Sequence, residues 1–205
     1  MTKRMKHRMR RAVTWWSTRN RQRKIRAIGR FIDQVGAQSL LMCGTGRIGG
    51  LPNEAMVEHA LASKMNTVMA MDIRAVGPQP WPFTLADARS MPFADQSYDL
   101  VLANAVIEHV GGEEDQRRFV AEQTRVGRSW VITTPNRWFP VESHTAVVFK
   151  HWSGRWRSDR ADFTRLLSRR EFIDLLPEGA VVVGHPWSST FTAYYEGLGT
   201  GDSAS

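Results

Sequence analysis

The chain lacks several features that define common protein classes. Its 205 residues include one cysteine, Cys43, which excludes an internal disulfide and a zinc site built from the cysteines of one chain. Because Cys43 lies in an apolar run, we interpret it as a buried, unreactive thiol. No stretch of about 18 apolar residues occurs, which argues against a membrane-spanning helix. The N-terminus has neither the apolar segment nor the cleavage site of a secretory signal, so we expect a cytoplasmic protein.

Acidic residues are absent from the first 30 positions, which hold 12 of the 28 lysines and arginines. The other 175 residues carry 16 basic and 20 acidic side chains, a net charge of −4, although the whole chain carries +8. The basic excess therefore belongs to one segment and does not by itself indicate a nucleic-acid-binding fold. We predict a mobile basic arm over residues 1–24, an α/β domain over residues 25–196 and a disordered tail over residues 197–205.

Two aromatic residues, Trp15 and Trp16, interrupt the basic arm. A basic segment with an aromatic pair suits peripheral contact with an anionic membrane. It suits a nucleic-acid backbone less well, because the rest of the chain is mildly acidic. A solvated arm whose tryptophans cover the edge of the domain is the third interpretation, and the sequence leaves all three open.

Hydrophobic periodicity divides the domain into alternating strands and helices. Apolar residues three and four positions apart from Ile25 to Val35 predict a helix packed on the core, which ends at Gly36. The first strand–helix–strand unit places its two strands side by side and parallel. The expected strands span residues 39–43, 66–71, 83–86, 98–103, 129–134, 180–184 and 190–195, and the further expected helices span residues 53–61, 112–126 and 168–176.

Glycines follow the first expected strand closely, as Gly44-Thr45-Gly46 and again at residues 49–50. Glycine allows a tight turn and the close approach of a ligand, but glycine clusters also end many ordinary strands. The second strand closes on Asp72, which a parallel arrangement places beside the glycine turn. There the carboxylate can accept both hydrogen bonds of a ribose diol, and capping a helix is the alternative role.

Four motifs stand at successive strand ends, namely CGTG, MDI, ADARSMPF and SYDLVLANAVIEHV. This series resembles the class I S-adenosylmethionine-dependent methyltransferases, specifically the methyltransferase type 11 family, over about residues 36–136. The resemblance implies an α/β fold with a Rossmann-like, seven-stranded, mostly parallel sheet and helices on both faces. It also implies S-adenosyl-L-methionine as the cofactor, and we expect no metal site.

The resemblance assigns the cofactor's methionine and ribose parts to the first two strand ends. The loop Gly44, Thr45 and Gly46 would pass beneath both parts. Asp72 would hold the ribose hydroxyls, with Ile73 as the next cofactor-binding residue of the MDI motif. S-adenosylmethionine has no phosphate, so the absence of a lysine from this glycine loop agrees with the resemblance.

The third and fourth strand ends would bind the adenine and the region near the sulfonium. By resemblance, Asp87 would accept a hydrogen bond from the adenine amine, and the Ala88 N–H would meet a ring nitrogen. Asn104 would line the cofactor near its sulfonium. For Asp87 the alternative is a residue that closes a turn.

The chain departs from the family pattern at two places. The family usually has an acid near the end of the first strand, where this chain has Met42 or a neighbour. The stretch from Gly46 to Asp72 is also longer than usual. The first departure leaves open how the cofactor's amino group is neutralised, and the second leaves open the shape of the loop.

Methyl transfer to oxygen or nitrogen needs a group that removes a proton from the acceptor. His109 and His144 are the candidate bases, since histidine titrates near neutral pH. The alternatives are a hydrogen-bonded residue that fixes its loop for His109 and an exposed loop residue for His144.

Residues 136–162 lose all periodicity and are rich in aromatic and basic residues, so we predict a substrate-side loop or lid over residues 135–162. Its composition would suit a small-molecule acceptor that is amphiphilic, anionic or lipid-linked. Together with the basic arm, it favours a cytoplasmic protein that acts at the inner face of a membrane. Two other functions remain, a degenerate, non-catalytic binding protein of the same fold and, less well supported, an NAD-dependent oxidoreductase.

Overall fold

The structure is a computed structural model that describes residues 3–46, 55–74, 77–78, 80–139 and 165–197. For residues 3–14 and residue 16 it describes the backbone alone. From residue 140 onward the predicted loop lies outside the described residues, as do His144 and the predicted tail from residue 198.

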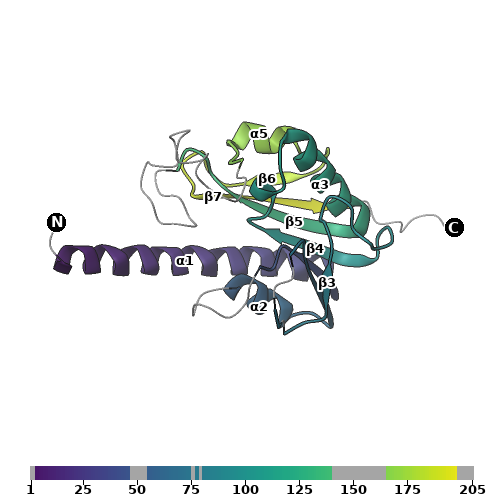
Figure 1. Cartoon of the computed structure of the whole chain (residues 1–205), viewed down its shortest axis with the longest axis horizontal. Helices are drawn as coiled ribbons and strands as arrows, with labels where there is room; N and C mark the ends of the chain where they lie inside the picture. The colour runs from purple at the N-terminus through teal and green to yellow at the C-terminus, as the bar shows by residue number, and fades with distance from the viewer. Residues whose placement is uncertain (1–2, 47–54, 75–76, 79, 140–164, 198–205) are drawn as a thin grey trace.

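Seven strands in the described part of the chain form one sheet, in the order β3-β2-β1-β4-β5-β7-β6 (Figure 1). The first five are parallel to their neighbours, and β7 runs antiparallel to β5 and β6. This confirms the mostly parallel, Rossmann-like sheet expected from the sequence. The strands are β1 (Ser39–Cys43), β2 (Thr67–Asp72), β3 (Phe83–Leu85), β4 (Tyr98–Asn104), β5 (Gly127–Pro135), β6 (Val181–Val183) and β7 (Thr190–Glu196).

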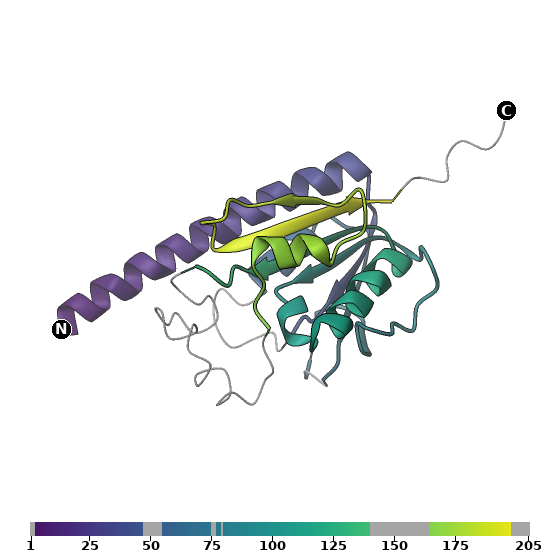
Figure 2. The same ribbon diagram turned by 90° about the horizontal axis from the view of Figure 1, so that it is seen from above.

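Helices cover both faces of the sheet (Figures 1 and 2). On one face lie α1 (Lys3–Val35) and α2 (Met56–Ala62), which pack through apolar residues such as Ile28 and Leu61. On the other lie the 3-10 helix η1 (Ile107–His109), α3 (Glu113–Val126) and α5 (Arg169–Asp174). The two faces have separate hydrophobic cores.

Period-two alternation along the strands sends side chains to the two cores in turn. In β1, Leu40 and Met42 face α1 and α2, while Leu41 and Cys43 face the other core. Burial raises the pKa of the Cys43 thiol, with a smaller contribution from Asp72, so the thiol stays protonated. The structure confirms that Cys43 is buried, and its lack of reactivity stays a prediction.

Helix α1 is longer than the sequence periodicity predicted. The expected boundary between an arm and a helix at residues 24 and 25 does not exist in the backbone, which is helical from Lys3 to Val35. The segment has no glycine or proline before Gly29, and its lysines, arginines and methionines are good helix formers. The N-terminal half of α1 projects beyond the sheet (Figures 1 and 2). Mobility of the arm stays a prediction.

The chain reverses its winding between β1 and β4, which are neighbours in the sheet. In open α/β sheets, ligands bind at such a switch point, outside the carboxyl ends of the strands. The predicted site residues follow the carboxyl ends of β1, β2, β3 and β4 and therefore gather along this edge. Across the described residues, the structure has no helix with both the length and the apolar character needed to cross a bilayer.

Candidate functional site

The first turn of the glycine loop needs glycine for two reasons. Gly44 has φ +66°, in the left-handed region. A Cβ at this position would lie 2.6 Å from Val106 Cγ2, so the loop packs directly against the segment that follows β4. The Gly44 N–H donates to the Met71 carbonyl at 2.8 Å, which fixes the loop to the end of β2.

Asp72 holds this loop from the end of β2. Its Oδ2 accepts from the Gly46 N–H at 3.0 Å, and its Oδ1 accepts from the Arg74 N–H at 2.9 Å. Residues 73 and 74 form a bend, so Asp72 does not cap a helix. The adjacent Ile73 side chain is exposed, an apolar surface at the edge where the cofactor is expected. The structure thus brings Asp72 and the glycine loop together, as the sequence predicted.

Thr45 carries an unsatisfied polar atom inside this loop. Its Oγ1 is buried and has no hydrogen-bond partner among the described residues. Buried hydroxyls are normally paired, and the exceptions need an explanation. A bound ligand with a polar group over the loop would supply the missing partner, which fits the cofactor role assigned to Thr45 by resemblance.

Asp87 closes a turn. Its Oδ1 accepts from the Arg89 N–H at 2.9 Å, and its carboxylate pairs with the Arg89 guanidinium at 2.6 Å. The hydrogen bond from the Arg89 side chain is the main reason why the pKa of Asp87 lies below its usual value. Next to it, the Ala88 carbonyl accepts from Gln123 Nε2 at 3.4 Å. The turn role is therefore present, and contact of Asp87 and Ala88 with adenine stays a prediction.

Asn104, at the end of β4, is the centre of a polar cluster that the sequence did not predict. Its Oδ1 accepts from Lys24 Nζ at 2.9 Å and from Thr133 Oγ1 at 2.8 Å, and its Nδ2 donates to Glu58 Oε1 at 2.8 Å. The cluster joins α1, α2, β4 and β5. Lys24 is partly exposed as a residue, but burial of its ammonium lowers its pKa to about 8.

The segment after Asn104 is strained. Ala105 has φ +60°, a left-handed conformation that residues other than glycine seldom adopt. Two interactions hold it there, because its N–H donates to the carbonyl and to the Oγ1 of Thr133 at 3.0 and 3.2 Å. The resulting turn sends Val106 against Gly44 and keeps Asn104 beside the glycine loop. Such strain concentrates at functional sites.

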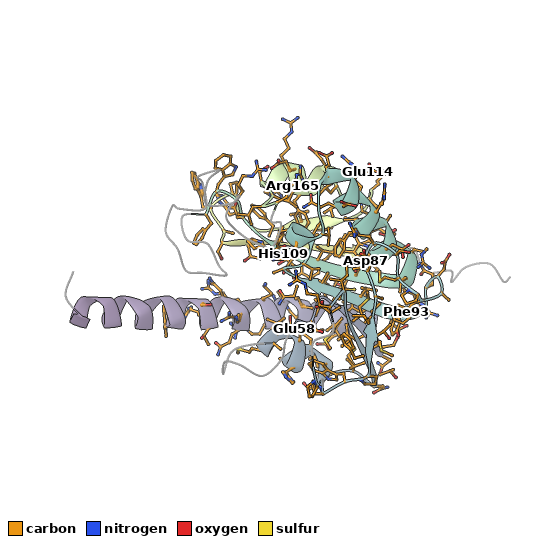
Figure 3. The ribbon with its side chains drawn as sticks, viewed as in Figure 1. Glu58, Asp87, Phe93, His109, Glu114 and Arg165 are labelled. Atoms are coloured by element: carbon orange, nitrogen blue, oxygen red, sulfur yellow. The ribbon has the colours of Figure 1, made fainter. Side chains whose placement is uncertain are left out.

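His109 lies on η1, one residue after the fully buried Glu108. Its Nε2 is 4.0 Å from Glu108 Oε1, and its side chain is 38% exposed. Figure 3 shows His109 and Glu58 on opposite sides of the carboxyl edge of the sheet. The Glu108 contact fits a residue that fixes its loop, and a role as base stays a hypothesis. In the described ranges, no group of three or more His, Cys, Asp or Glu could hold a metal ion.

Known proteins share the domain and the fold. A family model described as "Methyltransferase domain" matches residues 41–130. The N-methyltransferase NodS from Bradyrhizobium japonicum WM9 is 11% identical with a TM-score of 0.59, and the alignment covers 88% of this chain and 96% of NodS. A methyltransferase from Archaeoglobus fulgidus, described as SAM-dependent, is 12% identical with a TM-score of 0.55, and coverage is 85% and 93%.

A putative methyltransferase from Bacillus halodurans C-125 is 21% identical with a TM-score of 0.52, and coverage is 73% of this chain and 65% of that protein. No curated protein has a sequence that matches this chain significantly. At these identities the structural likeness shows the fold alone, and the sequence match is to a methyltransferase domain over residues 41–130. Residues 41–130, a little under half of the chain, match the model of a methyltransferase domain, and the chain shares its fold with solved proteins described as methyltransferases.

Proposed function

We propose that the chain binds S-adenosylmethionine and transfers its methyl group to an acceptor. The observation that carries the proposal is the glycine loop at the switch point, which the Asp72 carboxylate holds. Thr45 Oγ1 lines this loop and has no hydrogen-bond partner in the described part of the chain. Gly44 lets the backbone approach a ligand without a Cβ. The cofactor, when bound, supplies an activated methyl group on a sulfonium.

This chain's own residues would bind and orient that cofactor. The loop Gly44, Thr45 and Gly46 would lie beneath it, Asp72 would accept from the ribose hydroxyls, and Asn104 would lie nearest the sulfonium. Removal of the acceptor's proton would fall to His109 or His144. Alignment of the acceptor with the methyl group is the main contribution that such a site makes to the rate.

An NAD-dependent oxidoreductase fits the geometry less well. A dinucleotide needs a helix N-terminus directly after the glycine loop to bind its pyrophosphate. Among the described residues, the first helix after Gly46 is α2, which begins at Met56. A non-catalytic binding protein of the same fold remains the second candidate, because β1 offers no acid to the cofactor's amino group.

Calorimetry of the full chain separates these functions. We expect S-adenosylmethionine and S-adenosylhomocysteine to bind and NAD not to bind. Binding of NAD alone would favour the oxidoreductase, and binding of none of the three would refute the proposal. Incubation with methyl-labelled S-adenosylmethionine and membrane lipid extract then distinguishes an enzyme, which labels an acceptor, from a non-catalytic binder.

We also propose that the acceptor is amphiphilic or lipid-linked and that α1 contacts an anionic membrane from the cytoplasmic side. Trp15 is 64% exposed, and the Arg19 guanidinium lies 5.5 Å from its ring centre. Trp15 therefore does not cover the edge of the domain. An exposed tryptophan on a projecting basic helix suits the membrane–water interface. The exposed Trp138, in the described start of the predicted loop, supports the same kind of acceptor.

Flotation with vesicles tests the membrane contact. A chain that lacks residues 1–14 loses six basic residues, each worth about 1 kcal/mol near an anionic surface. We expect the full chain to float with phosphatidylglycerol-containing vesicles and the truncated chain to bind at least about tenfold less. Salt at high concentration should release the full chain. Equal flotation of both chains, or preferential binding of the arm to duplex DNA in competition, would contradict the proposal.

A further inference from the structure

The Asn104 amide stands between a buried ammonium and a carboxylate. Its oxygen accepts from Lys24 Nζ, and its nitrogen donates to Glu58 Oε1. Among the described residues, no ion pair within 4.0 Å joins Lys24 to Glu58 directly. One neutral amide thus presents an acceptor to the cation and a donor to the anion. The zwitterionic end of an amino acid would offer the same two groups with full charges.

The Lys24 ammonium has fewer partners than it can use. An ammonium has three N–H donors, and within the described residues Lys24 Nζ has two acceptors, Asn104 Oδ1 and Thr133 Oγ1. Both are neutral. A buried cation without a hydrogen-bonded anion is costly, and a bound carboxylate would remove that cost.

Charged groups on three elements act on this ammonium. Its burial has the largest effect and lowers its pKa to about 8, and Arg21 of α1 acts in the same direction. Glu58 of α2 and Glu108 of η1 partly oppose it. These carboxylates act on Lys24 from a distance, and among the described residues its hydrogen-bond acceptors are the neutral Asn104 and Thr133.

The cluster also lies where β1 lacks an acid. All side chains from Leu40 to Cys43 are apolar and buried, so the strand offers no carboxylate to a ligand above the glycine loop. Asn104 follows Ala103, which pairs with Cys43 at the end of β1. Two residues further on, Val106 packs against Gly44. Glu58 is thus a carboxylate that α2 brings to the edge where β1 has none.

We propose that Lys24 and Glu58 bind the amino-acid end of the cofactor, Lys24 its carboxylate and Glu58 its ammonium. This rests on the proposed function. Helices α1 and α2 then supply the charges that β1 lacks, and Asn104 keeps the two groups apart. The basic helix is consequently part of the cofactor site as well as the proposed membrane-binding element.

Two ligands separate the binding contribution of the cofactor's amino-acid end from that of the rest of the cofactor. S-adenosylhomocysteine has the amino-acid end, and 5′-methylthioadenosine has the same thioether and nucleoside without it. By calorimetry at pH 7, we expect Lys24→Met and Glu58→Gln each to weaken S-adenosylhomocysteine binding at least about tenfold. Binding of 5′-methylthioadenosine should change less than about twofold. Lys64→Met, which removes an exposed lysine paired with Asp33, is the matched control and should change neither.

Proton uptake on ligand binding is a second measurement. A purely structural role of Lys24 would not produce it. A carboxylate next to Lys24 raises the pKa of its ammonium, so binding near pH 8 is accompanied by proton uptake. At pH 6 the ammonium is already protonated and uptake from this group disappears. Calorimetry in buffers of different ionisation enthalpy should show this uptake for S-adenosylhomocysteine with the native chain. It should be absent with 5′-methylthioadenosine and in Lys24→Met.

The outcomes separate the two proposals. If the native chain binds neither ligand, the proposed function fails and this inference with it. If it binds both ligands and the two variants bind S-adenosylhomocysteine as tightly as the native chain, this inference alone is overturned. Equal losses for both ligands would also overturn it, since they would indicate a general disturbance. Should Lys24→Met unfold, the isosteric Glu58→Gln decides alone, with its folding checked by circular dichroism.

Discussion

Replacement of Asp72 by alanine should lower the affinity for S-adenosylhomocysteine by at least about 100-fold, or about 2.8 kcal/mol. In the proposed complex the carboxylate accepts from two ribose hydroxyls, and hydrogen bonds to a charged group contribute about 1.5–3 kcal/mol each. The substitution also removes the 3.0 Å hydrogen bond that the carboxylate accepts from the Gly46 N–H. Both effects act in the same direction, and calorimetry measures their sum.

Controls distinguish a lost ligand contact from a damaged loop. Asp33→Ala removes an exposed acid of α1 and should leave affinity unchanged. Asp72→Asn keeps one oxygen acceptor for the loop but removes the charge, so we expect an intermediate loss. A melting curve for each variant shows whether the domain remains folded. An Asp72→Ala variant that binds within about threefold of the native chain would refute the ribose assignment.

The strands were predictable from the sequence because their apolar runs are short and continuous. The first expected strand, residues 39–43, matches β1 residue for residue. Both faces of β1 are buried, so Leu40 to Cys43 form an unbroken apolar run, and Gly44 marks its end. The glycine loop and Asp72 followed from the same pattern, since the ends of adjacent parallel strands meet at one edge.

The full length of helix α1 was harder to predict, because hydrophobic periodicity appears only where a helix packs against the core. From Ile25 onward one face of the helix meets the core and the apolar spacing is visible. Before it, the projecting half has no such face to bury. Its helical backbone follows from residue propensity and from the absence of glycine and proline, which are weaker signals than a hydrophobic stripe.

The Lys24 cluster could not be read from local sequence, because its contacts join residues 80 and 109 positions apart. One signal was present. Lys24 precedes the buried Ile28 by four residues and Ile32 by eight, so it lies on the inward face of the helix. Among twelve basic residues in the first 30 positions, it extends that buried face. Its partner Asn104 was expected at the site for a different reason, the resemblance of the β4 motif.

Gly44→Ala should destabilise the domain by about 2–4 kcal/mol, the largest stability effect expected for a single methyl group at this site. Two terms contribute. A left-handed φ of +66° costs an alanine about 1–2 kcal/mol. The new Cβ would also lie 2.6 and 3.0 Å from the two Cγ atoms of Val106, which must move. Urea denaturation measures the loss, and unchanged slopes show that unfolding stays two-state.

A second glycine in the same loop separates the cost of the left-handed backbone from the cost of the clash with Val106. Gly46 has φ +61°, but among the described residues a Cβ added there would meet no atom within 4 Å. Gly46→Ala should therefore lose only the conformational part, about 1–2 kcal/mol. Val106→Ala should restore part of the stability lost in Gly44→Ala, because it removes the atoms that clash. Such non-additivity is the signature of direct contact. Equal losses for the two glycines, with no recovery in the double variant, would contradict the packing of the glycine loop against the β4 turn. That packing is what places Asn104, and with it Lys24 and Glu58, beside the cofactor.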